Sequence, residues 1–227
     1  MIPWERIGEA RAPDGTPLGL YRRGAELAIR AGAVVLMSSR QHASEDDLGA
    51  RGVEALGPGA AVLVGGLGMG FTLRAALDGL GPAARVVVAE LVPEVVAWAR
   101  GPLASLAGRP LDDPRVTVTV RDVADVLGEA RGAFDAVLLD VDNGPRPATQ
   151  QPNARLYGAR GIAAAAGALR PGGRIVVWST GDDPAFSARM AAAGLAVATW
   201  PARAHRSAAG APRGARQVLL VGTRPAR

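Results

Sequence analysis

The sequence predicts an α/β domain built around a sheet of seven mostly parallel strands with helices on both faces. From residue 61 onward, apolar runs of strand length alternate with segments of helical spacing, which is typical of repeated strand–helix–strand units. The composition agrees, because 48% of the residues are hydrophobic and only 4% are aromatic, so Ala, Val and Leu must make the core. At 227 residues the chain can bury one main core and carry a small additional region.

Residues 1–50 are predicted to form that additional region, a small β-hairpin or meander. Ser44, which precedes three acidic residues, is expected to cap a helix that leads into the main domain at residues 51–227. Short strand-like segments separated by residues that favour tight turns indicate the β region. These segments are residues 18–21, 26–30 and 33–37, and the turn residues are Asp14-Gly15, Gly24 and Gly32.

In the main domain the elements follow from the period of the apolar residues. The expected strands are residues 61–65, 85–91, 115–120, 134–140, 174–179, 195–200 and 216–223. The expected helices are residues 71–80, 94–106, 122–130, 156–169 and 184–193. Helices between strands imply right-handed crossovers and a parallel sheet. Only a loop, residues 201–215, separates the last two strands, so the final strand is expected to return antiparallel, as in class I methyltransferases.

The composition also excludes several kinds of chemistry and partner. The chain has no cysteine, which excludes disulfides and thiolate chemistry, and its two histidines, His42 and His205, lie far apart, so no metal site is expected. The net charge is +5, but the arginines that carry it are scattered, so nucleic-acid binding is not expected. No apolar run approaches the roughly 20 residues of a membrane-spanning helix, and we expect a cytoplasmic protein without membrane contacts.

A glycine-rich segment, Gly65-Gly66-Leu67-Gly68-Met69-Gly70, lies directly between the first strand and the first helix of the main domain. Glycines at this place permit a tight turn, let a ligand lie against the backbone, and leave the N–H groups of the following helix accessible. The alternative is a plain strand-to-helix turn. The residues predicted to bind a nucleoside cofactor are Gly65, Gly66, Leu67, Gly68 and Gly70.

Acidic residues at the ends of the next two strands complete the predicted nucleoside site. Glu90, 20 residues after Gly70, is placed to accept hydrogen bonds from both ribose hydroxyls, unless it is a solvent-facing acid. Asp122 is placed to accept from the amino group of adenine, with a neighbouring backbone N–H completing the contact, or to cap the helix that begins at Val123. Leu91 and Val123, which directly follow these acids, are included in the predicted site.

The fourth strand of the main domain ends in two further acids, next to the crevice where the strand order is expected to reverse. Asp140 and Asp142 are the predicted catalytic residues, because two carboxylates on one side of an extended chain can hold an amine and take up its proton. The alternative is a turn or capping role. Residues 144–152 are long for such a connection and are expected to cover the substrate. The predicted substrate contacts are Asn143, Tyr157 and His42.

Together these motifs resemble the spermidine synthase family of polyamine aminopropyltransferases. The resemblance rests on GGLGMG, Glu90, Asp122 and DVDNGP, on LRPGGRIVVWS, and on a preceding β region that ends in Met37-Ser38-Ser39-Arg40. It implies an N-terminal β domain, a class I methyltransferase-like domain, and a homodimer. It also implies that the glycine loop and Glu90 hold the donor nucleoside, that Asp122 meets adenine, and that Asp140 acts on the attacking amine.

The chain departs from the pattern of that family at three positions. The family's loop is typically GGGDGG, whose acidic residue meets the amino group of decarboxylated S-adenosylmethionine, and this chain has Gly68 there. The family's Tyr before the first helix of the main domain is absent from Gln41-His42-Ala43-Ser44-Glu45. The second acid of the family's DxxD pattern falls one residue early, at Asp142.

Without an acid at position 68, S-adenosylmethionine with its carboxylate becomes acceptable as the donor. We therefore expect methyl transfer to a small acceptor, such as an amine, in slight preference to aminopropyl transfer. Two alternatives come from other classes of protein. An NAD-dependent oxidoreductase would keep the glycines and Glu90 but gives no role to Asp122. A non-catalytic nucleoside-binding or regulatory protein would keep the fold without an acceptor site.

Overall fold

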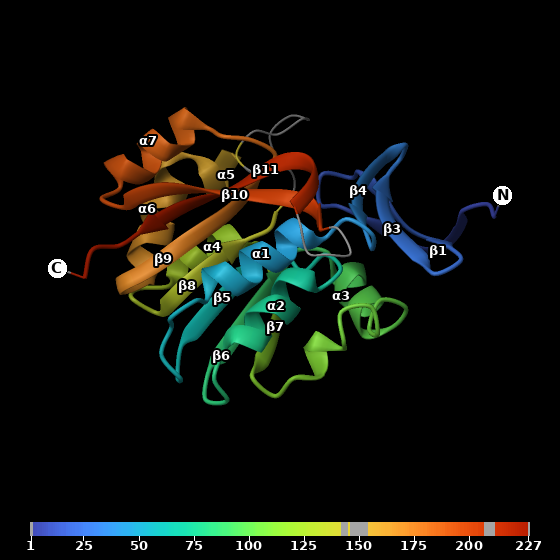
Figure 1. The fold of residues 1–227 in the computed structure, drawn as a ribbon, viewed down its shortest axis with the longest axis horizontal. Coiled ribbons are helices and arrows are strands. Elements are labelled where there is room, and N and C mark those ends of the chain that lie inside the picture. Colours follow the sequence, from blue (N-terminus) through green and yellow to red (C-terminus); the bar gives the residue numbers. More distant parts are fainter. Residues whose placement is uncertain (1, 142–144, 146–153, 207–211, 227) are drawn as a thin grey trace.

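The N-terminal strands form an antiparallel sheet of their own. The computed structural model describes residues 2–141, 145, 154–206 and 212–226, and in it four strands follow one another in the order β1-β2-β3-β4 (Figure 1). The predicted meander is confirmed, with one more strand than expected. The sequence pattern did not reveal β1 because only one of its seven residues is buried. The strands are β1 (Glu5–Arg11), β2 (Pro17–Arg23), β3 (Glu26–Ala31) and β4 (Val34–Ser38).

The central sheet has seven strands in the order β10-β11-β9-β8-β5-β6-β7. Strands β5 to β9 pair in parallel, and the last two strands continue the sheet as an antiparallel hairpin next to β9. The predicted fold class is therefore confirmed. The strands are β5 (Ala61–Gly65), β6 (Arg85–Glu90), β7 (Val116–Val120), β8 (Phe134–Leu139), β9 (Leu169–Ser179), β10 (Ala196–Arg206) and β11 (Pro212–Thr223).

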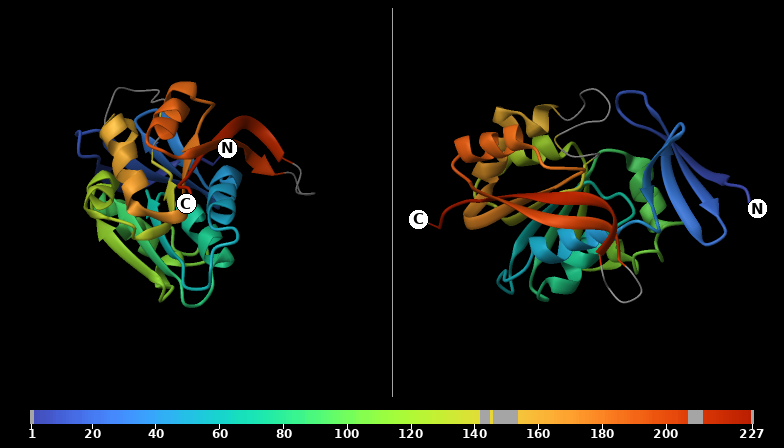
Figure 2. Two further views of the ribbon diagram at one scale, coloured as in Figure 1. Left: turned by 90° about the vertical axis from the view of Figure 1, so that its left-hand side faces the viewer. Right: turned by 45° about the horizontal axis from the view of Figure 1, so that its top comes forward.

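Helices cover both faces of the central sheet, as the left view of Figure 2 shows. Along β5, Val62 and Val64 join the apolar core under the first three helices, whereas Leu63 joins the core on the opposite face. This alternation buries the strand on both sides, which explains its uninterrupted apolar run. One face carries α1 (Ala43–Gly52), α2 (Phe71–Gly79) and α3 (Pro93–Arg100), and the other carries α4 (Val123–Glu129), α6 (Ala159–Ala168) and α7 (Pro184–Ala192).

Two predicted helices are shorter than expected. The helix expected at 94–106 ends at Arg100, and the chain continues in turns to a short 3₁₀ helix, η1 (Pro110–Asp112). The helix expected at 156–169 is interrupted at Gly158, whose backbone is extended, with φ −74° and ψ 171°. A four-residue helix, α5 (Ala154–Tyr157), precedes that break.

The terminal hairpin is longer than predicted. All of the described part of the expected loop 201–215 is strand, and the register runs from Ala196 opposite Thr223 to Arg206 opposite Pro212. The predicted antiparallel return is therefore confirmed, but the prediction of a loop at these residues is wrong. The two strands pair with each other well beyond the edge of β9 (Figure 1).

Helix α1 packs on α2 and on the strands β9 and β10 of the central sheet. It begins after His42, and the expected cap by Ser44 is wrong, because the Ser44 hydroxyl donates to the Glu45 carboxylate instead. Since α1 completes one layer of helices on the central sheet, we propose a domain boundary before residue 43 rather than after residue 50.

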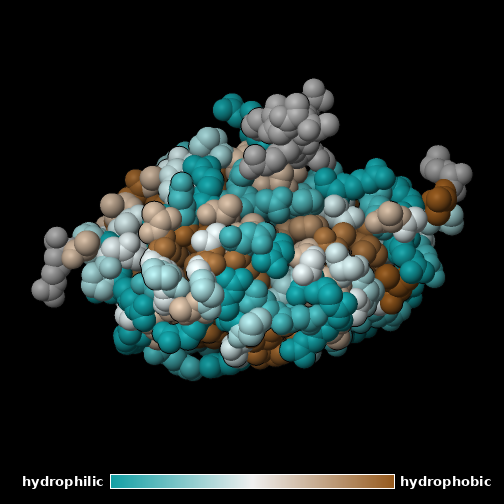
Figure 3. Space-filling view, turned by 60° about the horizontal axis from the view of Figure 1, so that its bottom comes forward, coloured by the Kyte–Doolittle hydropathy of each residue, from teal (hydrophilic) through white to brown (hydrophobic). Residues whose placement is uncertain are grey.

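The surface is mainly hydrophilic on the face that Figure 3 shows, with apolar residues between the polar ones. Exposed large apolar side chains on β4 are those of Val34, Val35 and Leu36. Within the described residues, no helix combines the length and the apolar character that crossing a membrane requires.

Candidate functional site

The strand order reverses at β5, because β6 and β7 lie on one side of it and β8 and β9 on the other. Ligands of open α/β sheets bind beyond the carboxyl ends of the strands at such a point. The structure has a cavity of about 50 Å³ there. The elements that line it are the glycine loop, β4, α1, α2 and the ends of β8 and β9, through residues that include Met37, Glu45, Gly68, Phe71, Asp140 and Trp178.

The glycines after β5 are required by the packing of the chain on itself. Gly66 has a φ of +86°, and a Cβ there would lie 2.2 Å from the carbonyl oxygen of Asp140. A Cβ on Gly65 would lie 2.7 Å from the side chain of Val123. Gly70 has a φ of +87° and is the N-cap of α2. These contacts explain the glycines without a ligand, so the predicted nucleoside contact of the loop stays a prediction.

Gly68 is different because the N-terminal sheet fills the space of its missing side chain. Its φ is +51°, and a Cβ there would lie 2.8 Å from the Sδ atom of Met37. Met37 is near the end of β4, so the N-terminal sheet supplies one wall of the cavity. A side chain at position 68 has to displace this thioether.

Glu90 is a buried acid that joins two segments of backbone. One carboxylate oxygen accepts from the backbone N–H of Leu67 at 2.9 Å, and the other accepts from the backbone N–H of Val92 at 2.9 Å. The alternative of a solvent-facing acid is wrong, because the residue is only 8% exposed. Its position couples the end of β6 to the glycine loop. The two bonds leave further lone pairs on both oxygens.

Asp122 caps helix α4. Its Oδ1 accepts from the backbone N–H of Ala124 at 2.8 Å, and its Oδ2 lies 3.5 Å from the guanidinium of Arg155. The capping alternative is therefore confirmed, and the adenine contact stays a prediction. Exposed apolar side chains stand nearby in the chain, at Leu91 after β6 and at Val120 before Asp122.

Asp140 lies at the end of β8 beside two polar side chains that the prediction did not include. The Thr72 hydroxyl, at the start of α2, donates to Asp140 Oδ2 at 2.7 Å and lies 3.3 Å from the carbonyl oxygen of Glu45. Burial, and after it the neighbouring Asp140 carboxylate, raise the pKa of Glu45 to about 7. Burial also raises the pKa of Asp140 to about 6, although the hydrogen bond from Thr72 favours its charged form.

The other predicted catalytic and substrate residues are placed as follows. His42 stacks on Phe71 with ring centroids 3.9 Å apart, and its Nδ1 lies 2.8 Å from Asp46 Oδ2, a contact that raises the pKa of His42. Tyr157 is buried and donates to the carbonyl oxygen of Val141 at 3.3 Å. Asp142, Asn143 and most of the predicted covering loop 144–152 lie outside the described residues.

Of the predicted residues, the structure thus brings Asp140 and the glycine loop together, and His42 lies next to them because it stacks on Phe71. It adds three residues that were not predicted, Glu45, Thr72 and Met37. Thr72 could have been noticed as a polar residue, only 2% exposed, on the otherwise apolar buried face of helix α2. The sequence did not single out Glu45, because an acidic residue in the first turn of a helix is already explained by its interaction with the helix dipole.

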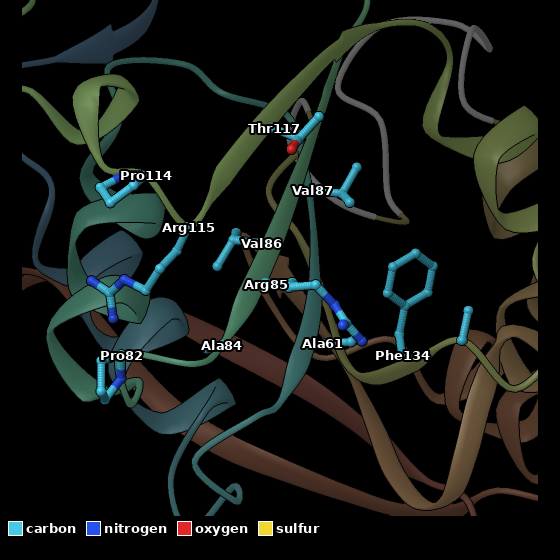
Figure 4. A pocket seen from close by; sticks show the side chains of 11 residues that line it. Ala61, Pro82, Ala84, Arg85, Val86, Val87, Pro114, Arg115, Thr117 and Phe134 are labelled. Atoms are coloured by element: carbon cyan, nitrogen blue, oxygen red, sulfur yellow. The ribbon is translucent and has the colours of Figure 1, made fainter.

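A larger hollow of about 500 Å³ lies at the opposite edge of the sheet (Figure 4). Residues at the first positions of β5, β6 and β8 line it, namely Ala61, Arg85 and Phe134. These are the amino ends of the strands, away from the glycine loop. The candidate site is therefore the smaller cavity at the carboxyl ends.

Comparison with known sequences gives a partial match. A polyamine aminopropyltransferase of Mycobacterium tuberculosis is 38% identical to this chain over 119 residues, which are 51% of this chain and 22% of that protein. A polyamine aminopropyltransferase of Mycobacterium bovis matches with the same identity and coverage. The matched part therefore spans about a fifth of the length of these relatives. No protein-family model matches the chain.

Comparison with solved structures covers all or nearly all of the chain. The spermidine synthase from Thermotoga maritima has a TM-score of 0.75 at 16% identity, covering 100% of this chain and 75% of that one. A spermidine synthase in complex with the transition state analogue AdoDATO has a TM-score of 0.75 at 15% identity, with the same coverage. A probable spermidine synthase from Corynebacterium glutamicum has a TM-score of 0.64 at 19% identity, covering 95% of this chain and 79% of that one.

The resemblance to spermidine synthases is confirmed in the fold and in a partial sequence match. The chain is thus similar to transferases that are named for aminopropyl transfer, and the expected preference for methyl transfer gains no support.

Proposed function

We propose that this protein transfers an aminopropyl group from decarboxylated S-adenosylmethionine to a small amine. The observation that carries the proposal is Asp140, a carboxyl at the end of β8 that lines the cavity beside the glycine loop. Its pKa, raised to about 6, suits a group that is ionised at neutral pH and still takes up a proton. The match to a polyamine aminopropyltransferase supports aminopropyl transfer from this donor over methyl transfer from S-adenosylmethionine. The homodimer and the cytoplasmic location stay predictions.

The residues around the loop fit an adenosine group. Glu90 keeps lone pairs on both carboxylate oxygens for ribose hydroxyls, although each oxygen already accepts one backbone N–H. Leu91 is 45% exposed and Val120 is 50% exposed, so apolar surface is available at the ends of β6 and β7 for an adenine ring. The buried indole N–H of Trp178, a residue of the cavity wall, has no partner among the described residues. A buried polar atom without a partner is consistent with a ligand site.

The donor supplies a carbon that is activated by a positively charged sulfur. Glu90 and the loop would hold its nucleoside, and the cavity would hold the amine with its nitrogen towards Asp140. The Asp140 carboxylate then accepts a proton from the amine. Because a displacement of this kind depends mainly on the alignment of the two reactants, positioning supplies most of the rate enhancement.

The experiment that tests the proposal compares donors on the same protein. With a short diamine as the acceptor, we expect turnover with decarboxylated S-adenosylmethionine and at least about tenfold weaker binding of S-adenosylmethionine, which corresponds to about 1.4 kcal/mol. Calorimetry with both donors and with methylthioadenosine measures the affinities, and mass spectrometry identifies the product. Methylated amine as the product would reject the proposal and favour methyl transfer, the second candidate that Gly68 supports.

An acid at position 68 is expected to sharpen the choice of donor. Gly68→Asp, combined with Met37→Ala to make room, places a negative charge where it attracts the donor amine and repels a carboxylate. We expect the affinity ratio of the decarboxylated to the ordinary donor to rise about tenfold. The matched control is Gly68→Asn with Met37→Ala, which has the same size without the charge. Equal ratios in the two variants would show that charge at this position does not select the donor.

A further inference from the structure

We infer that Glu45 is the second carboxyl of the reaction centre and that, with Asp140, it binds the ammonium group of the acceptor and shares its proton. This inference rests on the proposed function. Glu45 comes from helix α1 and Asp140 from the end of β8, segments far apart in the sequence, and both line the same cavity. The described residues thus contain a pair of acids that the spacing of the sequence does not show.

The hydrogen bonds around Glu45 and Asp140 allow either protonation state of Asp140. The Ser44 hydroxyl donates to Glu45 Oε2 at 2.5 Å, which fixes that side chain. Thr72 has one hydroxyl hydrogen and two neighbours, Asp140 Oδ2 at 2.7 Å and the carbonyl oxygen of Glu45 at 3.3 Å. When Asp140 is ionised, Thr72 can donate to it. When Asp140 is protonated, it can donate to Thr72, whose hydrogen then turns to the carbonyl.

The charges around the pair favour a cation. Two buried carboxylates repel each other, and burial with this repulsion raises the pKa of Glu45 to about 7. The other charged group that acts on Glu45 among the described residues is His42, the N-cap of the same helix, which itself pairs with Asp46. No arginine is among the residues that line the cavity, and the contact of His42 is with Asp46, so a bound ammonium can balance the two carboxylates.

The size and walls of the cavity suit the end of an alkylamine. A volume of about 50 Å³ holds a few waters, or an ammonium with the first methylene groups attached to it. The apolar part of the wall comes from Leu36, Phe71 and Trp178. Such walls favour methylene groups, and an aromatic ring also attracts a cation.

The proton balance of the proposed step is complete. An ammonium R–NH₃⁺ gives one proton to the pair and becomes R–NH₂. Its lone pair then forms the C–N bond to the donor carbon while the C–S bond breaks, and the electron pair of that bond leaves on sulfur, which becomes a neutral thioether. The product is a secondary ammonium ion, and the proton on the carboxyl pair goes to solvent after release.

The test is Glu45→Gln, which keeps the size of the side chain and removes its charge. We expect kcat/KM for diaminobutane with the decarboxylated donor to fall by about a hundredfold. The acid limb of the pH profile should move to lower pH by about one unit, because the carboxyl with a pKa of about 7 is lost and Asp140, with a pKa of about 6, then sets the limb. A merely structural role would not move that limb. The matched control is Glu54→Gln, an exposed acid just beyond the same helix, for which no change is expected.

Two more measurements separate the possible failures. Glu45→Asp keeps the charge and should recover part of the lost activity, and circular dichroism checks that both variants are folded. If the wild-type protein turns over no donor, the proposed function fails, and binding of diaminobutane alone then tests the inference. Calorimetry in buffers of different ionisation enthalpy should show proton release by the wild type, with less release and about tenfold weaker binding in Glu45→Gln. Equal binding and equal proton release, or an unchanged pH profile in the active enzyme, would overturn the role of Glu45.

Discussion

Replacing Asp140 by Asn is expected to lower turnover about a thousandfold while nucleoside affinity changes by less than about threefold. The amide cannot accept the proton of the amine at neutral pH, but it keeps the size of the side chain and can still accept the hydrogen bond from Thr72, which is 2.7 Å from Asp140 Oδ2 in the structure. Initial rates with diaminobutane give the first quantity, and calorimetry with methylthioadenosine gives the second.

The matched control is Asp78→Asn on helix α2. Its side chain is 67% exposed and pairs only with Arg74 among the described ion pairs, so its loss should leave turnover unchanged. Retention of more than about a third of the activity in Asp140→Asn would show that another group takes up the proton. Loss of nucleoside affinity in parallel would instead mean that Asp140 acts through the shape of the loop, since the loop packs on its carbonyl at Gly66.

The parallel strands β5, β6 and β8 were predictable because their burial leaves a direct trace in the sequence. All five residues of β5 are buried, so the strand appears as a continuous apolar run between glycines and turns. The extension of the terminal hairpin left no such trace. Residues 201–206 and 212–215 are small or charged, and they are strands because they pair with each other, which a local pattern does not contain.

The helix ends show which local rule the prediction overlooked. Helix α3 ends at Arg100, directly before Gly101-Pro102, and a residue before proline is driven away from the helical conformation. The apolar period continues past this point through Leu103 and Leu106, which suggested a longer helix. These side chains still pack on the core, but they do so from turns rather than from a helix. The period of the apolar residues therefore predicted correctly that Leu103 and Leu106 pack on the core, but it predicted too long a helix.

The candidate site was predictable where it depends on strand ends. Parallel strands bring their carboxyl ends to one edge, so Asp140 and the glycine loop could be assigned to one cavity from their places after two strands. The assignment of Glu90 and Asp122 to the same ligand stays a prediction. Glu45 and Met37 could not be assigned in this way. They come from α1 and β4, which precede the central sheet, and they reach the cavity only because α1 packs on α2 and β4 approaches Gly68.

Glu90→Gln is expected to lower both the stability of the protein and its affinity for the nucleoside. The amide has one oxygen, so only one of the two backbone N–H groups, of Leu67 and of Val92, keeps its acceptor, while the other faces the NH₂ group. A buried donor without a partner costs about 1–3 kcal/mol, so the free energy of unfolding in urea should fall by about 2 kcal/mol. The control is Glu94→Gln, an exposed acid in the first turn of α3, which should change it by less than about 0.5 kcal/mol.

The affinity for methylthioadenosine separates the structural role of Glu90 from the ribose contact. If the carboxylate also accepts from the ribose hydroxyls, calorimetry should show at least about tenfold weaker binding at temperatures where the variant is fully folded. If stability falls and affinity does not, the buried carboxylate only anchors the glycine loop to β6, and the ribose contact is rejected. Unchanged stability would be the more serious result, because it would mean that the two backbone bonds do not hold the loop against the sheet.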